Sequence, residues 1–173
     1  MPTELKEQAS KSTMHPTKID LSEKSRAKVI ELLNANLASA IDLHCQAKQA
    51  HWNVKGPQFI ALHELFDTVA TVVEGGIDVI AERAVILGGT AQGTVQTVGK
   101  RSALKPYPTD IAKGSDHVEA LASALAVYGK SVRAAIDTAT EAGDADTADL
   151  FTGISREIDK HLWFVEAHSQ AKS

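Results

Sequence analysis

The chain has 173 residues, a mass of 18.4 kDa and a formal net charge of −4, which suits a single domain. Hydrophobic residues make up 43% and charged residues 23% of the chain, which excludes a disordered or low-complexity protein. The single cysteine, Cys45, excludes an intramolecular disulfide and a cysteine-cluster zinc site, and the mild acidity disfavours nucleic-acid binding by bulk charge.

The first 19 residues lack hydrophobic periodicity and are rich in Lys, Ser, Thr and Pro. This composition predicts a mobile N-terminal tail over residues 1–19. The segment has no apolar stretch of the kind found in export signals, and nowhere does an apolar run approach the roughly 20 residues that span a bilayer. We therefore expect a cytoplasmic protein with no membrane partner.

The first long helix is expected to begin at Asp20 or Ser22, either of which is a good N-cap, and to end before Gly56-Pro57. Its inward stripe includes His44, which we expect to make a buried hydrogen bond. A second helix is expected from near Phe59 to Gly88-Gly89.

The segment 90–109 is too long for a simple connector and is expected to hold one short helix around Val95 to Val98. A third long helix is expected to begin near Thr109 or Asp110, and a fourth to be capped by Asp144 or Asp146. No segment alternates with period two, so the fold class is all-α. The long crossover between the second and third long helices suits a four-helix bundle over residues 20–169, with a short C-terminal tail at 170–173.

The second helix carries ligand-type side chains in two pairs, His63 with Asp67 and Asp78 with Glu82. Each pair is four residues apart, and the eleven residues from Asp67 to Asp78 make about three turns, so all four share one face. Imidazole and carboxylate groups suit iron, manganese or zinc, and His51 at the end of the first helix is a nearby third ligand. Solvated helix-face pairs are the alternative interpretation.

One metal site cannot use both pairs, because Asp67 and Asp78 lie roughly 16 Å apart along the helix axis. However, the residue numbers of His63 and Glu82 have the same sum as those of Asp67 and Asp78. Two copies of this helix, packed antiparallel about a two-fold axis, would therefore bring one pair opposite the other and form two shared sites. Gly75 and Gly76 lie near the centre of that symmetry, where they either allow close approach or only soften the helix. No Glu-x-x-His occurs, which disfavours a di-iron centre within one subunit.

Several segments together resemble the Dps family, the mini-ferritins also called DNA-binding proteins from starved cells. They are KQAHWNVKG at 48–56, FIALHE at 59–64, DVIAERA at 78–84, YPTDI at 107–111 and LWFVEA at 162–167. The resemblance covers about Asp20 to His168. It implies a ferritin-like subunit assembled with its own copies into a hollow dodecamer. It also implies a ferroxidase centre shared between two subunits, with iron ligands His51, His63 and Asp67 from one chain and Asp78 and Glu82 from the other.

The resemblance further implies that the protein oxidises Fe(II), preferably with hydrogen peroxide rather than oxygen, and stores a ferric mineral that spares DNA from oxidative damage. Trp52 corresponds to the family tryptophan near the centre, a radical or electron relay; by itself it is equally a buried aromatic at a helix end. A nucleoid-binding structural protein that mainly compacts DNA is the alternative function. A plain helical interaction module is the third.

Two further groups of charged residues are candidates for the transport of iron and for DNA contact. An acidic cluster at the turn between the third and fourth long helices would line a cation pore at a three-fold axis, although helix capping and solvated charge also explain it. It comprises Asp137, Glu141, Asp144, Asp146 and Asp149. Lys6, Lys11 and Lys18 are candidates for non-specific DNA contact through many tails together, and a solubilising tail is the alternative.

Overall fold

The computed structural model describes residues 14–170. Its helices are α1 (Glu23–Asn53), α2 (Phe59–Ile86), α3 (Val95–Arg101), α4 (Gly114–Glu141) and α5 (Ala145–Gln170). Within that described part no β-strand occurs, and the single β-bridge joins Lys55 to Lys113. The expected all-α class is confirmed.

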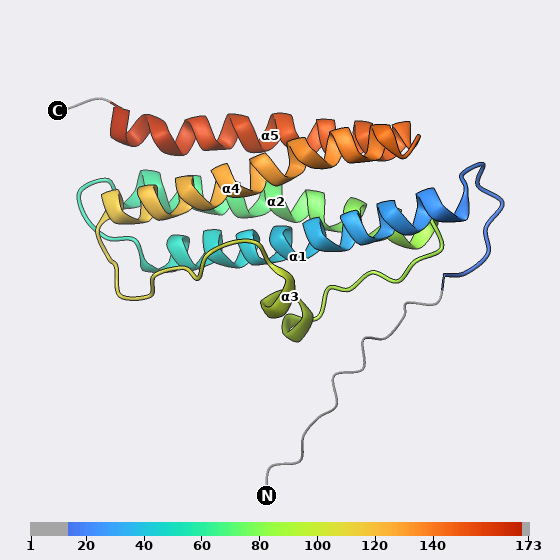
Figure 1. Cartoon of the computed structure of the whole chain (residues 1–173). Coiled ribbons are helices and arrows are strands. Elements are labelled where there is room, and N and C mark those ends of the chain that lie inside the picture. The colour runs from blue at the N-terminus through green and yellow to red at the C-terminus, as the bar shows by residue number, and fades with distance from the viewer. Residues whose placement is uncertain (1–13, 171–173) are drawn as a thin grey trace, which may run out of the picture.

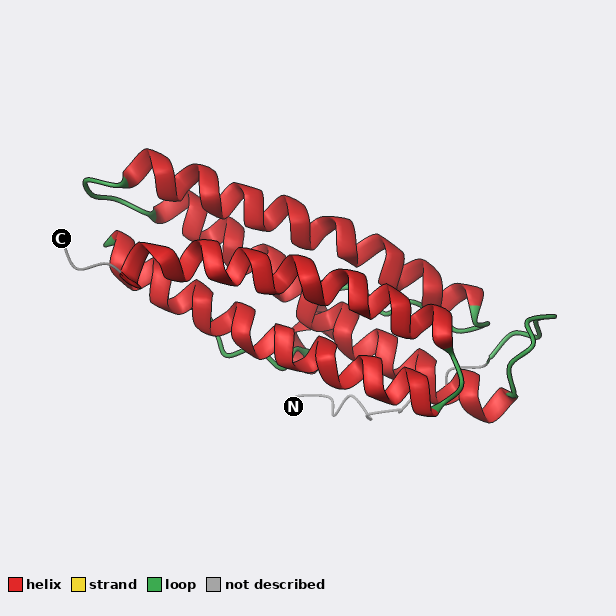
Figure 2. Ribbon diagram, turned by 90° about the horizontal axis from the view of Figure 1, so that it is seen from above, coloured by secondary structure: helices red, strands yellow, loops and turns green. Residues whose placement is uncertain are grey.

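The four long helices form a bundle of two hairpins. Figures 1 and 2 show α1 beside α2 and α4 beside α5, with all four axes close to parallel or antiparallel. The connection from α2 to α4 runs back along the whole bundle and holds the short helix α3, which packs on α1. This is the predicted ferritin-like arrangement with one long crossover.

Helix boundaries follow local capping chemistry. Ser22, rather than Asp20, caps α1, because its hydroxyl accepts a hydrogen bond from the Ser25 amide at 3.1 Å. After Asn53 the chain turns at Gly56, whose φ of +117° lies in the region that favours glycine.

A single core runs the length of the bundle and contains side chains from all four long helices. Spaced three or four apart along each helix, these side chains are almost completely withdrawn from solvent. The largest fully buried ones are Leu33, Leu37, Leu43, Leu62, Phe66, Ile80, Leu121, Leu125, Tyr128, Phe151 and Ile158.

The expected start of the third long helix at Thr109 or Asp110 is wrong, because α4 begins at Gly114. The amide of Lys55 donates to the carbonyl oxygen of Ala112 at 2.9 Å, so the residues before Gly114 lie extended against the α1–α2 turn. A Cβ at Gly114 would come within 2.6 Å of Leu62 Cδ1, which shows how closely α4 approaches α2 at this point. The short helix continues past Val98 to Arg101.

Residues 14–19 lie against the bundle rather than in the mobile tail expected over 1–19. The His15 amide donates to the Gly88 carbonyl oxygen at 2.7 Å, and Arg26 Nη1 donates to the Leu87 carbonyl oxygen at 2.9 Å. These donors satisfy carbonyl groups that the end of α2 leaves free. Met14 and Ile19 pack on the core. Among residues 14–170, no helix combines the length and the apolar character needed to cross a bilayer.

Candidate metal centre

His51 and His63 hold each other in place across the α1–α2 turn. His51 Nδ1 lies 2.8 Å from the His63 carbonyl oxygen, and His63 Nδ1 lies 2.8 Å from the His51 carbonyl oxygen. The two rings stack with centroids 3.7 Å apart. A carbonyl oxygen can only accept, so both Nδ1 atoms carry a proton, and in the neutral imidazoles the lone pair is on Nε2. The tautomer of each neutral imidazole thus leaves Nε2 available to a metal ion.

Asp67 lies one turn beyond His63 and is held by a cation. Lys48 Nζ donates to Asp67 Oδ1 at 2.6 Å. This hydrogen bond, helped by the positive charge, lowers the pKa of Asp67 below its ordinary value. The carboxylate is therefore ionised at neutral pH, but a metal ion would have to compete with Lys48 for it.

Asp78 and Glu82 lie exposed further along α2 and have no hydrogen-bond or ion-pair partner among residues 14–170. No group of three or more His, Cys, Asp or Glu side chains in the described part of the chain is arranged to hold a metal ion. The predicted ligands of one subunit thus lie in two separate groups, with His51, His63 and Asp67 in one and Asp78 and Glu82 in the other. Their union in a dimer stays a prediction.

Trp52 is 67% exposed, so its interpretation as a buried aromatic is wrong for the single chain. Lys48 Nζ lies 5.8 Å from the centroid of its ring, which places the indole on the side of the bundle where Lys48 meets Asp67. Phe59 and Ile60 are also exposed, at 44% and 61%. Phe59 packs beside His63, with ring centroids 5.1 Å apart.

In the acidic cluster between α4 and α5, some carboxylates form ion pairs or cap a helix, and others have no ion-pair partner among residues 14–170. Asp144 is buried and caps α5: it accepts from the Thr147 amide at 3.0 Å, from the Thr147 hydroxyl at 2.6 Å and from Arg83 at 2.6 Å. The capping interpretation therefore holds for Asp144, whose carboxylate is not free to line a pore. Asp146 lies 3.8 Å from Arg83 and Glu141 lies 3.5 Å from Lys28.

Asp137 and Asp149 are exposed and form no ion pair within residues 14–170. The pore stays a prediction for Asp137, Glu141, Asp146 and Asp149. Of the candidate DNA contacts, Lys18 is exposed, while Lys6 and Lys11 lie outside the described residues.

Sequence patterns singled out no role for His117 and Tyr107. His117 is 1% exposed, and its Nδ1 lies 2.8 Å from the Tyr107 hydroxyl, which joins α4 to the crossover. Burial lowers the pKa of His117. The two residues lie across an irregular loop, so no periodic signal could have paired them. For His44 a buried hydrogen bond is expected; its Nδ1 lies 3.1 Å from the Ala70 carbonyl oxygen, and this hydrogen bond is partly buried.

Comparison with known proteins gives one consistent result. Residues 30–171 match the ferritin-like domain family. The chain is 54% identical over 159 residues to the DNA protection during starvation protein of Agrobacterium fabrum, covering 92% of this chain and 98% of that protein.

Solved structures agree. DpsC from Streptomyces coelicolor superposes with a TM-score of 0.89 at 28% identity, covering 93% of this chain and 94% of that one. The DPS protein from Vibrio cholerae O1, described as a member of a broad superfamily of ferritin-like diiron-carboxylate proteins, gives 0.84 at 26% identity, covering 91% and 99%.

Proposed function

The chain belongs to the Dps family of ferritin-like proteins, and from this premise we propose that it is a ferroxidase that oxidises Fe(II) and stores the Fe(III) product. The oxidant is hydrogen peroxide in preference to oxygen. The ferric mineral accumulates inside a hollow shell of twelve subunits in the cytoplasm, where removal of iron and peroxide together protects DNA.

The observation that carries the proposal is the reciprocal bonding of His51 and His63, which leaves both Nε2 atoms free for a metal ion. Other histidines among residues 14–170 also place Nδ1 at a carbonyl oxygen, but only in this pair is the bonding mutual and the two rings stacked on each other. The ionised Asp67 lies one turn along the same helix, so imidazole and carboxylate donors come together on one face.

The proposed centre is completed by Asp78 and Glu82 of a second subunit. Both carboxylates are exposed and free of partners among residues 14–170, so they are available to a neighbour. Carboxylates stabilise Fe(III) more than Fe(II), which favours oxidation. Two Fe(II) ions give up two electrons, one peroxide takes them with two protons, and two waters form, so that no hydroxyl radical is released. Trp52, exposed beside Lys48, would supply an electron when only one Fe(II) is bound.

The test is complementation between two inactive variants. His63→Ala removes one half-site and Asp78→Ala the other, so each homo-oligomer should lose rapid peroxide-driven Fe(II) oxidation. In a shared site, an interface between one subunit of each kind contains one intact centre and one doubly damaged centre. Random co-assembly at equal amounts should therefore restore about a quarter of the wild-type centres.

The matched control is His168→Ala, which removes an exposed histidine on α5. Its oxidation rate should equal that of the wild type, with about one peroxide consumed per two Fe(II). Failure of the co-assembled variants to regain any activity would refute the shared centre. Wild-type oxidation no faster than buffer would refute the ferroxidase.

A further inference from the structure

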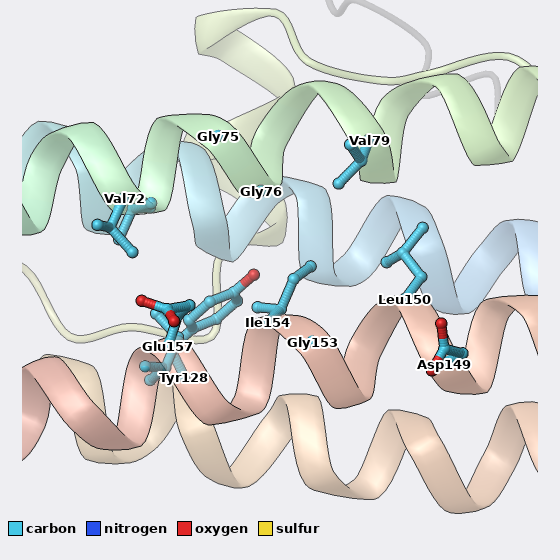
Figure 3. Close-up of a pocket in the computed structure, with 12 residues that line it drawn as sticks. Val72, Gly75, Gly76, Val79, Tyr128, Asp149, Leu150, Gly153, Ile154 and Glu157 are labelled. Atoms are coloured by element: carbon cyan, nitrogen blue, oxygen red, sulfur yellow. The ribbon is translucent and has the colours of Figure 1, made fainter.

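A groove between α2 and α5 is separate from the proposed iron ligands. It encloses about 470 Å³, and its walls are mainly aliphatic side chains such as Val72, Val79 and Ile154. Figure 3 shows α2 above and α5 below, with the groove running along both helices. Viewed down the axis of α2, the groove residues Val72, Gly76 and Val79 lie roughly a third of a turn away from the face that carries the proposed metal ligands of this helix. The groove and the candidate metal centre therefore face different directions.

Three helix-interior glycines create the hollow. Gly75 and Gly76 come from α2 and Gly153 from α5. A Cβ at Gly75 or Gly153 would meet nothing within 4 Å, and one at Gly76 would make only an ordinary contact with Ile154, at 3.6 Å. Packing within the chain therefore does not require glycine here, although each costs about 1 kcal/mol of helix stability relative to alanine. Within the single chain, these glycines leave open space along the groove.

The floor of the groove carries a polar group without a partner. Tyr128 of α4 is 1% exposed, and its hydroxyl has no hydrogen-bond partner among the described residues; its oxygen is not fully buried, so it opens into the groove. Figure 3 shows that hydroxyl directed from α4 towards α2, into the groove. Because the hydroxyl opens into the groove, a ligand group or water in the groove can serve as its hydrogen-bond partner. Burial raises the pKa of Tyr128, so the group remains a neutral phenol that can accept or donate.

A carboxylate lies at each end of the groove. Figure 3 shows Asp149 at one end of the α5 wall and Glu157 at the other, with the Tyr128 hydroxyl between them. Asp149 and Glu157 are eight residues apart on α5, which is a rise of roughly 12 Å along the helix axis. Asp149 has no ion-pair partner among residues 14–170, whereas the half-exposed Glu157 pairs with Lys160 Nζ at 3.2 Å and lies 3.8 Å from His161 Nδ1. The groove thus offers one free and one paired carboxylate, a central hydroxyl and aliphatic walls, and a ligand cation at Glu157 would compete with Lys160.

We propose that this groove binds a linear aliphatic polyamine with the chain length of spermidine. The terminal ammonium groups would pair with Asp149 and Glu157, whose spacing matches such a chain when extended. The central ammonium would donate to the Tyr128 hydroxyl oxygen, and the methylene segments would lie along Val72, Val79 and Ile154. A metal ion alone would leave the aliphatic walls unused, and an apolar ligand would leave Asp149 and the Tyr128 hydroxyl without a partner.

The experiment is equilibrium dialysis of radiolabelled spermidine against the assembled full-length protein at about 150 mM salt, where loose counter-ions are screened. We expect saturable binding of about one spermidine per subunit, and binding of the four-carbon diamine putrescine about tenfold weaker, because it cannot span both ends. Asp149→Asn and Tyr128→Phe should each weaken spermidine binding, the first by about tenfold. Gly153→Leu should abolish binding by filling the groove while favouring the helix.

Glu119→Gln is the control, because it removes one negative charge from the exposed face of α4, outside the groove. Its spermidine affinity should equal that of the wild type. Three outcomes would overturn the proposal: no saturable binding, as expected if a neighbouring subunit covers the groove; equal weakening in Glu119→Gln and Asp149→Asn; or full affinity in Gly153→Leu. Circular dichroism and the elution volume of each variant verify that it folds and assembles.

Discussion

Backbone carbonyl oxygens fix the tautomers of His51 and His63, a role that carboxylates fill in many metal sites. In those sites a carboxylate accepts from the distal ring nitrogen and fixes the tautomer of a ligating histidine. Here each histidine donates to the carbonyl oxygen of the other residue. The sequence predicts both as ligands from residue type and spacing. It does not predict their mutual bonding, because that depends on the turn that brings Asn53 back to Phe59.

Lys48 is a residue whose role only the structure reveals, since nothing in its position on α1 pairs it with Asp67 of α2. Its ammonium holds the carboxylate that a metal ion would use, at 2.6 Å. In Lys48→Met the competing cation is removed and the aliphatic stem is retained. We expect this variant to bind Co(II), a stable probe for Fe(II), about two- to fivefold more tightly at neutral pH. Isothermal titration calorimetry measures the change.

The same variant should respond differently to acid. Because Lys48 lowers the pKa of Asp67, its removal raises that pKa towards the ordinary value, so protons compete with Co(II) at a higher pH than in the wild type. Lys28→Met is the matched control, because Lys28 pairs with Glu141 away from the proposed ligands. Weaker Co(II) binding in Lys48→Met at neutral pH would mean that Lys48 supports the centre instead of competing for it.

At the scale of helices, periodicity predicts the bundle well, because each long helix buries one continuous stripe. The errors fall where long-range backbone contacts decide the structure. The late start of α4 follows from the hydrogen bond between the Lys55 amide and the Ala112 carbonyl oxygen. The docking of residues 14–19 follows from that between the His15 amide and the Gly88 carbonyl oxygen. Neither contact leaves a periodic trace in the sequence.

The start of α5 gives a prediction about stability. Asp144 is buried and satisfies both Thr147 and Arg83, so Asp144→Ala leaves a largely buried guanidinium without its main partner and removes the cap. We expect a loss of about 2–4 kcal/mol in the free energy of unfolding. Asp144→Asn should recover part of it, since asparagine also caps helices. Urea denaturation at fixed protein concentration measures both changes.

Asp146→Ala is the control for this comparison. Its side chain is 85% exposed and lies 3.8 Å from the same arginine, so its loss should change stability by less than about 0.5 kcal/mol. If the two alanine variants unfold alike, the cap and buried ion pair do not stabilise α5 as described.

At the scale of the whole molecule, the proposed iron centre is not complete within the described part of a single chain. Its proposed ligands form two half-sites roughly 16 Å apart along one helix, a separation that no rearrangement of a straight helix can close. A two-fold axis across the helix requires facing residues to have the same sum of residue numbers, so the symmetric spacing of His63 and Asp67 with Asp78 and Glu82 can be read from the sequence. The groove with Tyr128 leaves no such trace, since it depends on side chains from three helices.

The alternative function, DNA compaction, can be separated from iron oxidation by deleting residues 1–13. The deletion ends before Met14 because the chain is fixed to the bundle from there on, so the body should stay intact. Within residues 1–13, Lys6 and Lys11 are offset by Glu4 and Glu7, so each tail attracts DNA weakly and retention must come from many tails together. We expect DNA retention in gel shifts near 20 mM salt that disappears by about 200 mM, and no retention after the deletion. Peroxide-driven Fe(II) oxidation should be unchanged. If the full-length protein still retains DNA at about 150 mM salt, DNA compaction is favoured as the main role. If the deletion variant still retains DNA, the contact is made by residues 14–170, where Lys18 is exposed, and not by residues 1–13.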